Sequence, residues 1–401
     1  MSKKNDDFFV EKKPWSTVKD ELLGCYFKPY VQKILFTYKP LVYVDCFAGK
    51  GKFEDGNPGS PLIALDIIDQ CLHSTSVEKA PRIEATFIDL NYAEDLKVNL
   101  SGYRNVNIIP GKYEDNIQSI LKDKTNCNVF LYIDPYGIKA LRCDLFDSFA
   151  DGQFKSIELL INMNSFGFIR EACHAMGASF DDAALFADLV EYEPSTMDTS
   201  EKSILELNEI AGGDYWKAII ESYKCGEIDG YEAEARFAEQ YCMRLMDKYT
   251  YVLNMPLRIK KGQRPKYRMI HATNHRDGCL LMVDNIYSRW QALQEIQRGG
   301  QISMWDENFD NQFIDESDIE QKAIEHFSQC TNWTSLHDAL AIFFIKYGPI
   351  CSTGSVKKIL REFEKKGKLQ VLRNPDKKIN GTPTIFMSEK KDQTVSVRWR
   401  A

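Results

Sequence analysis

The segment from Val42 to Gly51, with the sequence VYVDCFAGKG, decides the fold of this 401-residue chain. An apolar run, Leu41 to Val44, ends at Asp45 and opens into a turn that contains Gly49 and Gly51. Such a run predicts a short buried strand. Because glycine tolerates positive φ and has no side chain, the turn lets the backbone approach a ligand closely. We therefore predict a strand followed by a ligand-binding turn.

The same alternation of strand and helix continues on both sides of this segment. Ser16 is predicted to cap a helix over 16–36, and Ser60, followed by Pro61, a helix over 60–73. The alternation predicts an α/β fold with an open, mostly parallel, Rossmann-like sheet that helices cover on both faces. The predicted strands are 41–44, 83–88, 106–109, 129–133 and 157–161, and further helices are expected up to residue 100 and over 113–121 and 144–150.

Beyond the fifth strand the chain is predicted to continue in three parts. Residues 165–248 lose the strand pattern and form a helical insertion, and 249–259 and 266–273 then form a hairpin with a basic turn. Near the end, three helical patterns precede two extended pieces, 369–372 and 384–387, which is typical of a winged helix-turn-helix. The predicted domains are 1–40, a helical segment that packs on the ligand site; 41–164 with 249–300, the sheet domain; 165–248, the insertion; 301–317, a linker; and 318–401, the winged helix.

The overall composition is that of a soluble protein, but its charge is unevenly distributed. The formal net charge is −7. From Thr353 onward, thirteen Lys or Arg face five acidic residues, so this tail is basic and the rest of the chain is acidic. No signal peptide pattern and no apolar stretch of about 18 to 20 residues is present, and the eleven cysteines are scattered without a CxxC pair. We expect a cytoplasmic protein with reduced thiols and no metal site.

Polar or glycine residues follow four successive predicted strands. Asp45, Asp89, Gly111 and Asp134 stand at these ends, where open α/β sheets bind their ligands. A dinucleotide site would need a third glycine at the place of Glu54, and the chain has no P-loop. S-adenosylmethionine fits both findings, because it needs a glycine turn for its methionine part, an acid for both ribose hydroxyls and an apolar floor for adenine. We predict it as the cofactor.

Several motifs resemble those of known families. VYVDCFAGKG, with Phe87 to Asp89 and Asp134 to Gly137, resembles the motif series of class I S-adenosylmethionine-dependent methyltransferases. The closer resemblance, over about residues 8 to 298, is to the three-Cys-motif partner proteins, a bacterial family usually encoded beside a radical-enzyme-like protein with three cysteines. It rests on KKPWS (12–16), DCFAGKGKFEDG (45–56), GSP (59–61), LYIDPYG (131–137) and HATNHRDG (271–278). It implies an antiparallel sixth and seventh strand.

The resemblance also implies the residues of the site. Asp134, Pro135 and Tyr136 stand where amino-methylating enzymes carry Asp/Asn-Pro-Pro-Tyr/Phe, although Tyr replaces the second proline and Gly the aromatic residue. We expect Asp134 to accept a hydrogen bond from the target amino group and Tyr136 to stack on the base; the alternative is a turn that only lines the cofactor site. His271, Asn274, His275 and Arg276 are expected to face the substrate. The expected cofactor-binding residues are Lys13, Trp15, Asp45, Phe47, Ala48, Gly49, Gly51, Asp89, Leu90, Gly111 and Asp134.

Two basic regions favour a nucleic-acid partner. One is the turn of the predicted hairpin, and the other lies on the predicted winged helix. The residues expected to bind nucleic acid are Lys260, Lys261, Arg264, Lys266, Lys357, Lys358, Arg361, Lys377 and Lys378. The predicted function is methyl transfer to an amino group of a nucleic-acid base. The alternatives are a non-catalytic adaptor that presents nucleic acid to a three-cysteine partner protein, a winged helix that docks on a protein, and a nuclease.

Overall fold

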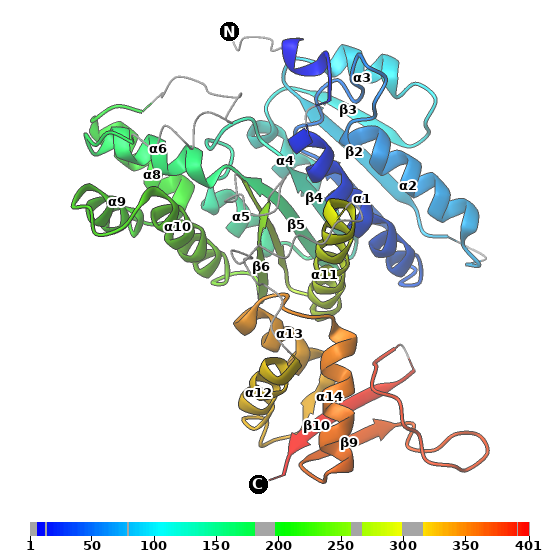
Figure 1. The fold of residues 1–401 in the computed structure, drawn as a ribbon. Helices are drawn as coiled ribbons and strands as arrows, with labels where there is room; N and C mark the ends of the chain where they lie inside the picture. The colour runs from blue at the N-terminus through cyan, green and yellow to red at the C-terminus, as the bar shows by residue number, and fades with distance from the viewer. Residues whose placement is uncertain are drawn as a thin grey trace. The chain divides into compact units, whose positions relative to one another are not determined.

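A computed structural model describes residues 6–12, 14–77, 80–180, 197–257, 267–298, 316–390 and 392–400. The described residues form two compact units, which divide between Asn274 and His275 (Figure 1). In the part of the chain that the structure describes, no helix is long and apolar enough to cross a membrane.

The first unit is built on a seven-stranded sheet with the order β3-β2-β1-β4-β5-β7-β6. Strands β1 to β5 are parallel, and β7 runs antiparallel to both β5 and β6. The prediction of a mostly parallel α/β sheet with an antiparallel hairpin is therefore confirmed. The strands are β1 (Leu41–Asp45), β2 (Ile83–Asp89), β3 (Val106–Pro110), β4 (Asn128–Ile133), β5 (Ser156–Met163), β6 (Tyr251–Leu257) and β7 (Tyr267–Thr273).

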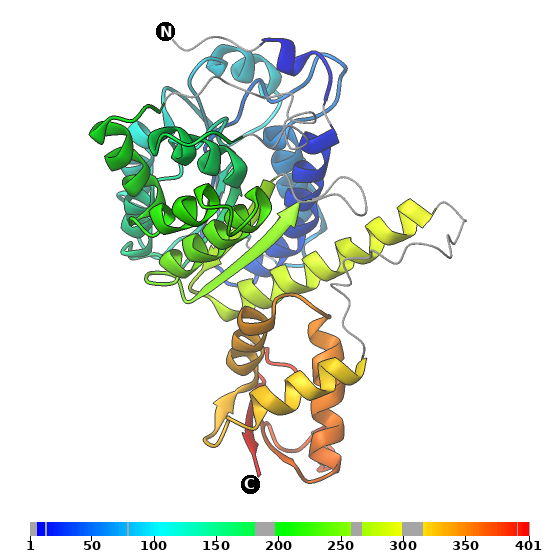
Figure 2. The same ribbon diagram turned by 60° about the vertical axis from the view of Figure 1, so that its left-hand side comes forward.

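Helices cover both faces of this sheet, as Figures 1 and 2 show. The blue helices α1 and α2 pack together on one face, and the green helices of the insertion lie on the other. The predicted helical character of 165–248 is confirmed over its described residues. The helical segments are η1 (Asp6–Phe9), α1 (Pro14–Leu35), α2 (Ser60–Ser74), α3 (Ala93–Asn99), α4 (Tyr113–Leu121), α5 (Cys143–Ala150), α6 (Ser165–Ala175), α8 (Glu201–Ala211), α9 (Trp216–Lys224) and α10 (Gly230–Leu245).

Two predicted helix caps are wrong. Helix α1 begins at Pro14, two residues before Ser16, because a proline ring presets the helical φ in the first turn. Gly59 rather than Ser60 is the N-cap of α2. The Ser60 hydroxyl instead donates to Oδ2 of Asp45 over 2.7 Å, so it serves the end of β1 rather than its own helix.

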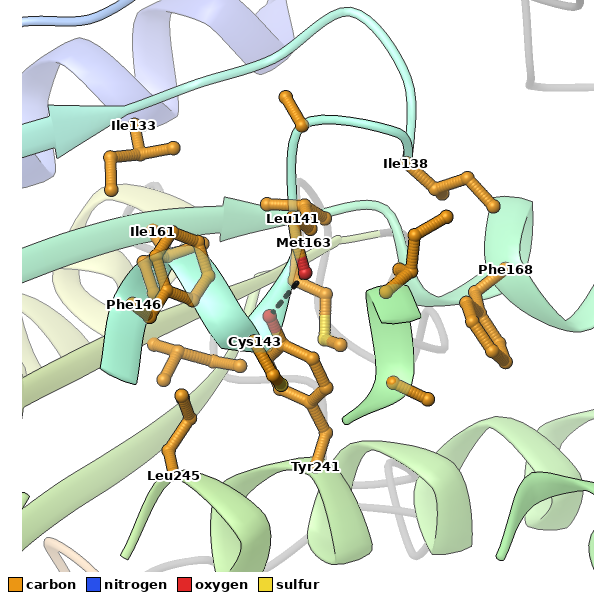
Figure 3. Close-up of a cluster of buried hydrophobic side chains, with 14 of the residues drawn as sticks. Ile133, Ile138, Leu141, Cys143, Phe146, Ile161, Met163, Phe168, Tyr241 and Leu245 are labelled. Carbon is orange, nitrogen blue, oxygen red and sulfur yellow. Dashed lines mark hydrogen bonds between the residues drawn. The ribbon is translucent and has the colours of Figure 1, made fainter. Parts of the chain in front are cut away.

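One hydrophobic core lies between the sheet and the insertion. Figure 3 shows Ile133 and Ile161 of neighbouring strands packed against Phe146, Tyr241 and Leu245. The Tyr241 hydroxyl donates to the carbonyl oxygen of Leu141 over 2.9 Å, which satisfies the one polar group of that ring. Because side chains alternate along a strand, the residues next to Ile133 and Ile161 point to the opposite face, toward α1.

The face under α1 buries a polar cluster of Tyr26, Glu158 and His271. Nε2 of His271 lies 2.9 Å from Oε2 of Glu158, and the Tyr26 hydroxyl donates to the same oxygen. His271 is fully buried, since it pairs with Leu160 in the centre of the sheet. The prediction that it faces a substrate is wrong. Asn274 is likewise engaged with the fold, where its side-chain oxygen accepts from the backbone N–H of Thr250.

The second unit contains helices and an antiparallel sheet of order β8-β10-β9. The predicted strand 384–387 is wrong: the partner of β9 is 394–399, which alternates apolar Val395 and Val397 with polar residues and buries both valines. Its elements are α11 (Arg276–Arg298), α12 (Glu316–Phe327), β8 (Thr334–Ser335), α13 (Leu336–Tyr347), α14 (Thr353–Lys365), β9 (Leu369–Asn374) and β10 (Thr394–Trp399).

Helix α11 belongs to this second unit, although the sequence assigned 249–300 to the sheet domain. The physical reason is its bonding. Arg276 pairs with Asp338 of α13 over 2.7 Å, and Asp284 accepts from the backbone N–H and hydroxyl of Thr353, both over 2.8 Å. Arg276 therefore helps to hold the second unit together.

The cluster under α1 yields a stability prediction. Tyr26→Phe removes a donor from a buried carboxylate, so we expect the free energy of unfolding to fall by about 1 to 2 kcal/mol. Tyr43→Phe is the matched control on the same face: among the described residues its buried hydroxyl has no hydrogen-bond partner, so its loss should be neutral or stabilising. Urea unfolding measures both. Equal destabilisation by the two variants would contradict the assignment.

Candidate active site at the carboxyl edge of the sheet

The order of the strands brings three polar side chains to one edge. Asp45 pairs in register with Tyr132 of β4, and Ile133 of β4 with Ile161 of β5. Asp134 and Asn162, the next residues of those two strands, therefore lie side by side on the α1 face. The chain leaves β1 toward β2 and β3 on one side and reaches β4 and β5 on the other, so β1 and β4 flank the switch point where open α/β sheets bind ligands.

The glycine turn after β1 is held by Asp89. One carboxylate oxygen of Asp89 accepts from the N–H of Gly49 over 2.9 Å, and the other accepts from the N–H groups of Asn91 and Tyr92, both over 2.8 Å. Gly49 and Gly51 have φ values of 60° and 77°, which favour glycine. A carboxylate has about four acceptor sites, so Asp89 keeps about one for a ligand.

Asp45 is a fully buried carboxyl group at the end of β1. It accepts from the Ser60 hydroxyl and, over 3.3 Å, from the N–H of Phe47. Burial and, to a smaller extent, the nearby carboxylates of Asp134 and Asp20 raise the pKa of Asp45 to about 7, although these two hydrogen bonds lower it. Burial also raises the pKa of Asp20 to about 6, in spite of its ion pair with Lys12. Acidic groups thus crowd this edge.

Asp134 forms an ion pair with Lys19 of α1. The ammonium of Lys19 lies 2.9 Å from Oδ1 and 2.8 Å from Oδ2 of Asp134, and the side-chain amide of Asn162 donates to Oδ1 over 2.6 Å. The side chains of Lys19 and Asp134 are 12% and 21% exposed. The carboxylate is therefore held from two sides and is still reached by solvent.

The N-terminal segment packs over the glycine turn. The ring of Phe9 lies 2.9 Å from the position that a Cβ on Gly49 would take, and it joins Phe53 and Tyr92 in a small buried cluster. The ammonium of Lys50 lies 5.2 Å from the Phe9 ring centroid and 5.3 Å from that of Tyr92, at cation–π distance.

Lys12 anchors this segment at its other end. Its ammonium pairs with Asp20 over 2.7 Å and donates to the carbonyl oxygen of Pro58 over 2.7 Å, and its backbone N–H donates to Asp55. Lys13 and the side chain of Trp15 lie outside the described residues. Within residues 1–40, Phe9, Lys12 and Lys19 make the described contacts around this site.

The other predicted site residues lie around the same edge. Ala48 is buried, and its N–H donates to the carbonyl oxygen of Ile88 over 3.0 Å. Phe47 packs on Tyr113 with ring centroids 5.4 Å apart. Leu90 is 47% and Tyr136 49% exposed, while Pro135 is buried. Gly111 has φ 129° and donates its N–H to the carbonyl oxygen of Asp89 over 3.1 Å.

The predicted nucleic-acid residues divide into two groups. Those of the hairpin turn, Lys260, Lys261, Arg264 and Lys266, lie outside the described residues. In the second unit Lys358 and Arg361 on α14 are exposed, as are Lys377 and Lys378 in the loop between β9 and β10, whereas Lys357 is half-buried.

Lys19, Asp20 and Asn162 were missed by sequence reasoning. Asn162 follows the apolar run 157–161 as Asp134 follows 129–133, so the rule that found the other strand ends also points to it. Lys19 and Asp20 lie inside a helical pattern and carry no such signal. No group of three or more His, Cys, Asp or Glu within the described ranges could hold a metal ion.

Comparisons with known proteins found only distant structural similarity. No protein-family model matches the sequence, and no curated protein matches it. The structure is similar to loganic acid methyltransferase with SAH (11% identity, 73% of this chain and 86% of that one, TM-score 0.31) and to geranyl diphosphate methyltransferase with GPP and sinefungin (11%, 62% and 77%, 0.26). A protein from Escherichia coli named as a methyltransferase, yhhF, is 18% identical over 39% of this chain and 72% of its own length, with a TM-score of 0.26. Likeness at this level does not define a family.

The contact between Phe9 and the glycine turn can be tested with two glycine variants. Gly49→Ala adds both backbone strain and a clash with Phe9, so hydrogen exchange in residues 6–12 should accelerate. Gly56→Ala is the matched control: its φ is 90°, but a Cβ there has no atom within 4 Å, so it adds strain alone. Slow exchange of 6–12 in both variants would contradict the packing described.

The raised pKa of Asp45 predicts a dependence of stability on pH. Its folded pKa of about 7 lies above the usual value near 3.9, so the fold favours the protonated form. Its stabilising contribution is complete below about pH 4 and is lost as the pH rises to about 7. Relative to wild type, Asp45→Asn should gain stability over this range, by at most about 1.4 kcal/mol per pH unit. Urea unfolding at pH 5 and pH 8 measures the difference in stability between the two proteins. Asp20 is present in both, so its titration cancels in the comparison. An equal difference at the two pH values would exclude the raised pKa of Asp45.

Proposed function

We propose that the protein is an S-adenosylmethionine-dependent methyltransferase that acts on an amino group of a nucleic-acid base. The observation that carries the proposal is the edge of the sheet: a glycine turn after β1, a carboxylate after β2 and an ion-paired carboxylate after β4, in a sheet whose seventh strand is antiparallel. An antiparallel strand at this place is a mark of methyltransferase sheets.

The residues at this edge fit the chemical groups of the cofactor. Its ammonium and ribose hydroxyls are hydrogen-bond donors, and Asp45 and Asp89 offer carboxylate acceptors. Asp89 is half-buried and has about one acceptor site left, which suits one hydroxyl. Leu90 beside it exposes an apolar side chain that can serve as the floor for adenine.

The chemistry requires positioning more than strong base catalysis. When bound, the cofactor would supply a methyl group from a positively charged sulfur. The N–C bond forms in line as the C–S bond breaks, the neutral thioether leaves, and the amino proton passes to solvent. Asp134 accepts a hydrogen bond from that amino group, which aligns the nitrogen lone pair. The ion pair with Lys19 holds this carboxylate in place. The exposed Tyr136 ring offers a surface for stacking a flipped base.

Nucleic acid as the substrate is supported by the second unit. The order helix, strand, helix, helix, strand, strand with a β8-β10-β9 sheet is the outline of a winged helix. Lys358 and Arg361 are exposed on its third helix after α11, and Lys377 and Lys378 on the loop that would form the wing. Exposed cations at these two places suit a phosphate backbone.

A second candidate function is a non-catalytic adaptor that presents nucleic acid to a three-cysteine partner protein. The observation in its favour is the Lys19 ion pair, because both oxygens of Asp134 already contact an ammonium. In an adaptor this pair would only fasten α1 to the sheet.

Titration calorimetry with S-adenosylmethionine separates the two functions. We expect the wild-type protein to bind and Asp89→Ala to bind about tenfold more weakly or worse, because a charged hydrogen-bond acceptor is lost. Asp95→Ala, an exposed carboxylate on α3, is the matched control and should bind normally. Tritium transfer to DNA, tRNA and rRNA then identifies the acceptor, and Asp134→Ala should abolish it. Absence of heat at millimolar ligand, with nucleic-acid binding retained, would leave the adaptor.

A further inference from the structure

We infer that the side-chain oxygen of Asn162 is a specificity determinant of this site: it accepts a hydrogen bond from the amino group of the methyl acceptor. The inference rests on the proposed function and deepens it by naming a second acceptor beside Asp134. Asn162 is the last residue but one of β5 and lies next to Asp134, and the residue is 2% exposed. Among the described residues Oδ1 of Asn162 has no hydrogen-bond partner.

The orientation of this amide is determined by its neighbour. Nδ2 of Asn162 lies 2.6 Å from Oδ1 of Asp134, and the ammonium of Lys19 contacts both oxygens of that carboxylate. Since an ammonium only donates, both oxygens of Asp134 act as acceptors here. Turning the amide over would place two acceptor oxygens against each other, so Nδ2 must face Asp134 and Oδ1 must point away.

An orphaned buried acceptor selects the chemistry of its partner. A buried carbonyl oxygen without a donor costs about 1 to 3 kcal/mol, and native proteins pair such groups almost always. The partner must carry an N–H or O–H group, which excludes anions and acceptor-only groups such as a ring nitrogen without hydrogen. Asn162 Oδ1 and the Asp134 carboxylate are acceptors on neighbouring strands, and an exocyclic amino group carries two hydrogens to donate.

The position in the sheet favours the methyl acceptor over the cofactor as the source of that donor. The glycine turn, Asp89 and Gly111 stand at the ends of β1, β2 and β3, on one side of the switch point. Asp134 and Asn162 stand at the ends of β4 and β5, on the other side. The exposed Tyr136 is two residues from Asp134, whose side chain is 21% exposed, whereas Asn162 is buried.

The test uses base recognition, which does not require methyl transfer. Short single-stranded oligonucleotides carry a central adenine or cytosine, or the matched purine or 2-pyrimidinone that lacks the exocyclic amino group. Fluorescence anisotropy gives the ratio of their Kd values for the full-length protein. We expect wild type to prefer the amino-bearing base and Asn162→Ala to lose about five- to tenfold of that preference.

Asn164→Ala is the matched control. Asn164 lies two residues further on, and its side chain caps α6 by accepting from the N–H of Gly167 over 2.8 Å. Its loss should lower stability in urea without changing the base preference. An unchanged preference in Asn162→Ala would overturn the inference and leave a buried water as the partner of Oδ1. Weaker binding of S-adenosylmethionine by Asn162→Ala, with the base preference intact, would also overturn it and assign the donor to the cofactor.

Failure of the proposed function gives a different result. A wild-type protein that neither binds S-adenosylmethionine nor transfers a methyl group, but still discriminates the amino group through Asn162, would refute the methyltransferase and retain the recognition site. Methyl transfer that proceeds with equal KM and kcat in wild type and Asn162→Ala would retain the methyltransferase and refute the role of Asn162.

Discussion

The in-register pairing of parallel strands is the constraint on which this site depends. Because side chains alternate along each strand, Ile133 and Ile161 enter one core while Asp134 and Asn162 must face the other side together. A shift of one residue in either strand would turn the polar group of that strand into the apolar core. The apolar pattern that stabilises the sheet therefore also sets the geometry of its polar edge.

Helix α1 completes the edge from above. Its adjacent residues Lys19 and Asp20 form separate ion pairs, Lys19 with Asp134 at the end of β4 and Asp20 with Lys12 of the N-terminal segment. One helical turn thus joins the ligand edge to the segment that packs on the glycine turn. The buried contact of Tyr26 with Glu158 fastens the next part of the same helix, so α1 can hold these charges at fixed positions.

Much of the fold and part of the site follow from local sequence. Strand runs such as 129–133 and glycine turns have local physical signatures, and the predicted sheet with its antiparallel hairpin is confirmed. What failed depends on partners distant in sequence. The Ser60 hydroxyl donates to Asp45 instead of capping its own helix, and His271 is buried where β7 pairs with Leu160 of β5. The partner of β9 is β10 rather than the predicted strand 384–387, because β10 buries two valines. Lys19 was missed because its ion-pair partner, Asp134, lies 115 positions away in the sequence.

Asp20 and Asp45, whose pKa values are raised to about 6 and about 7, hold protons at this edge near neutral pH. A cation that binds beside Asp20 and Asp45 favours their ionised forms, so it must displace protons as it enters. Binding of any positively charged ligand would then be tighter in alkaline than in acidic solution, and its apparent enthalpy would vary with the ionisation heat of the buffer that takes up those protons.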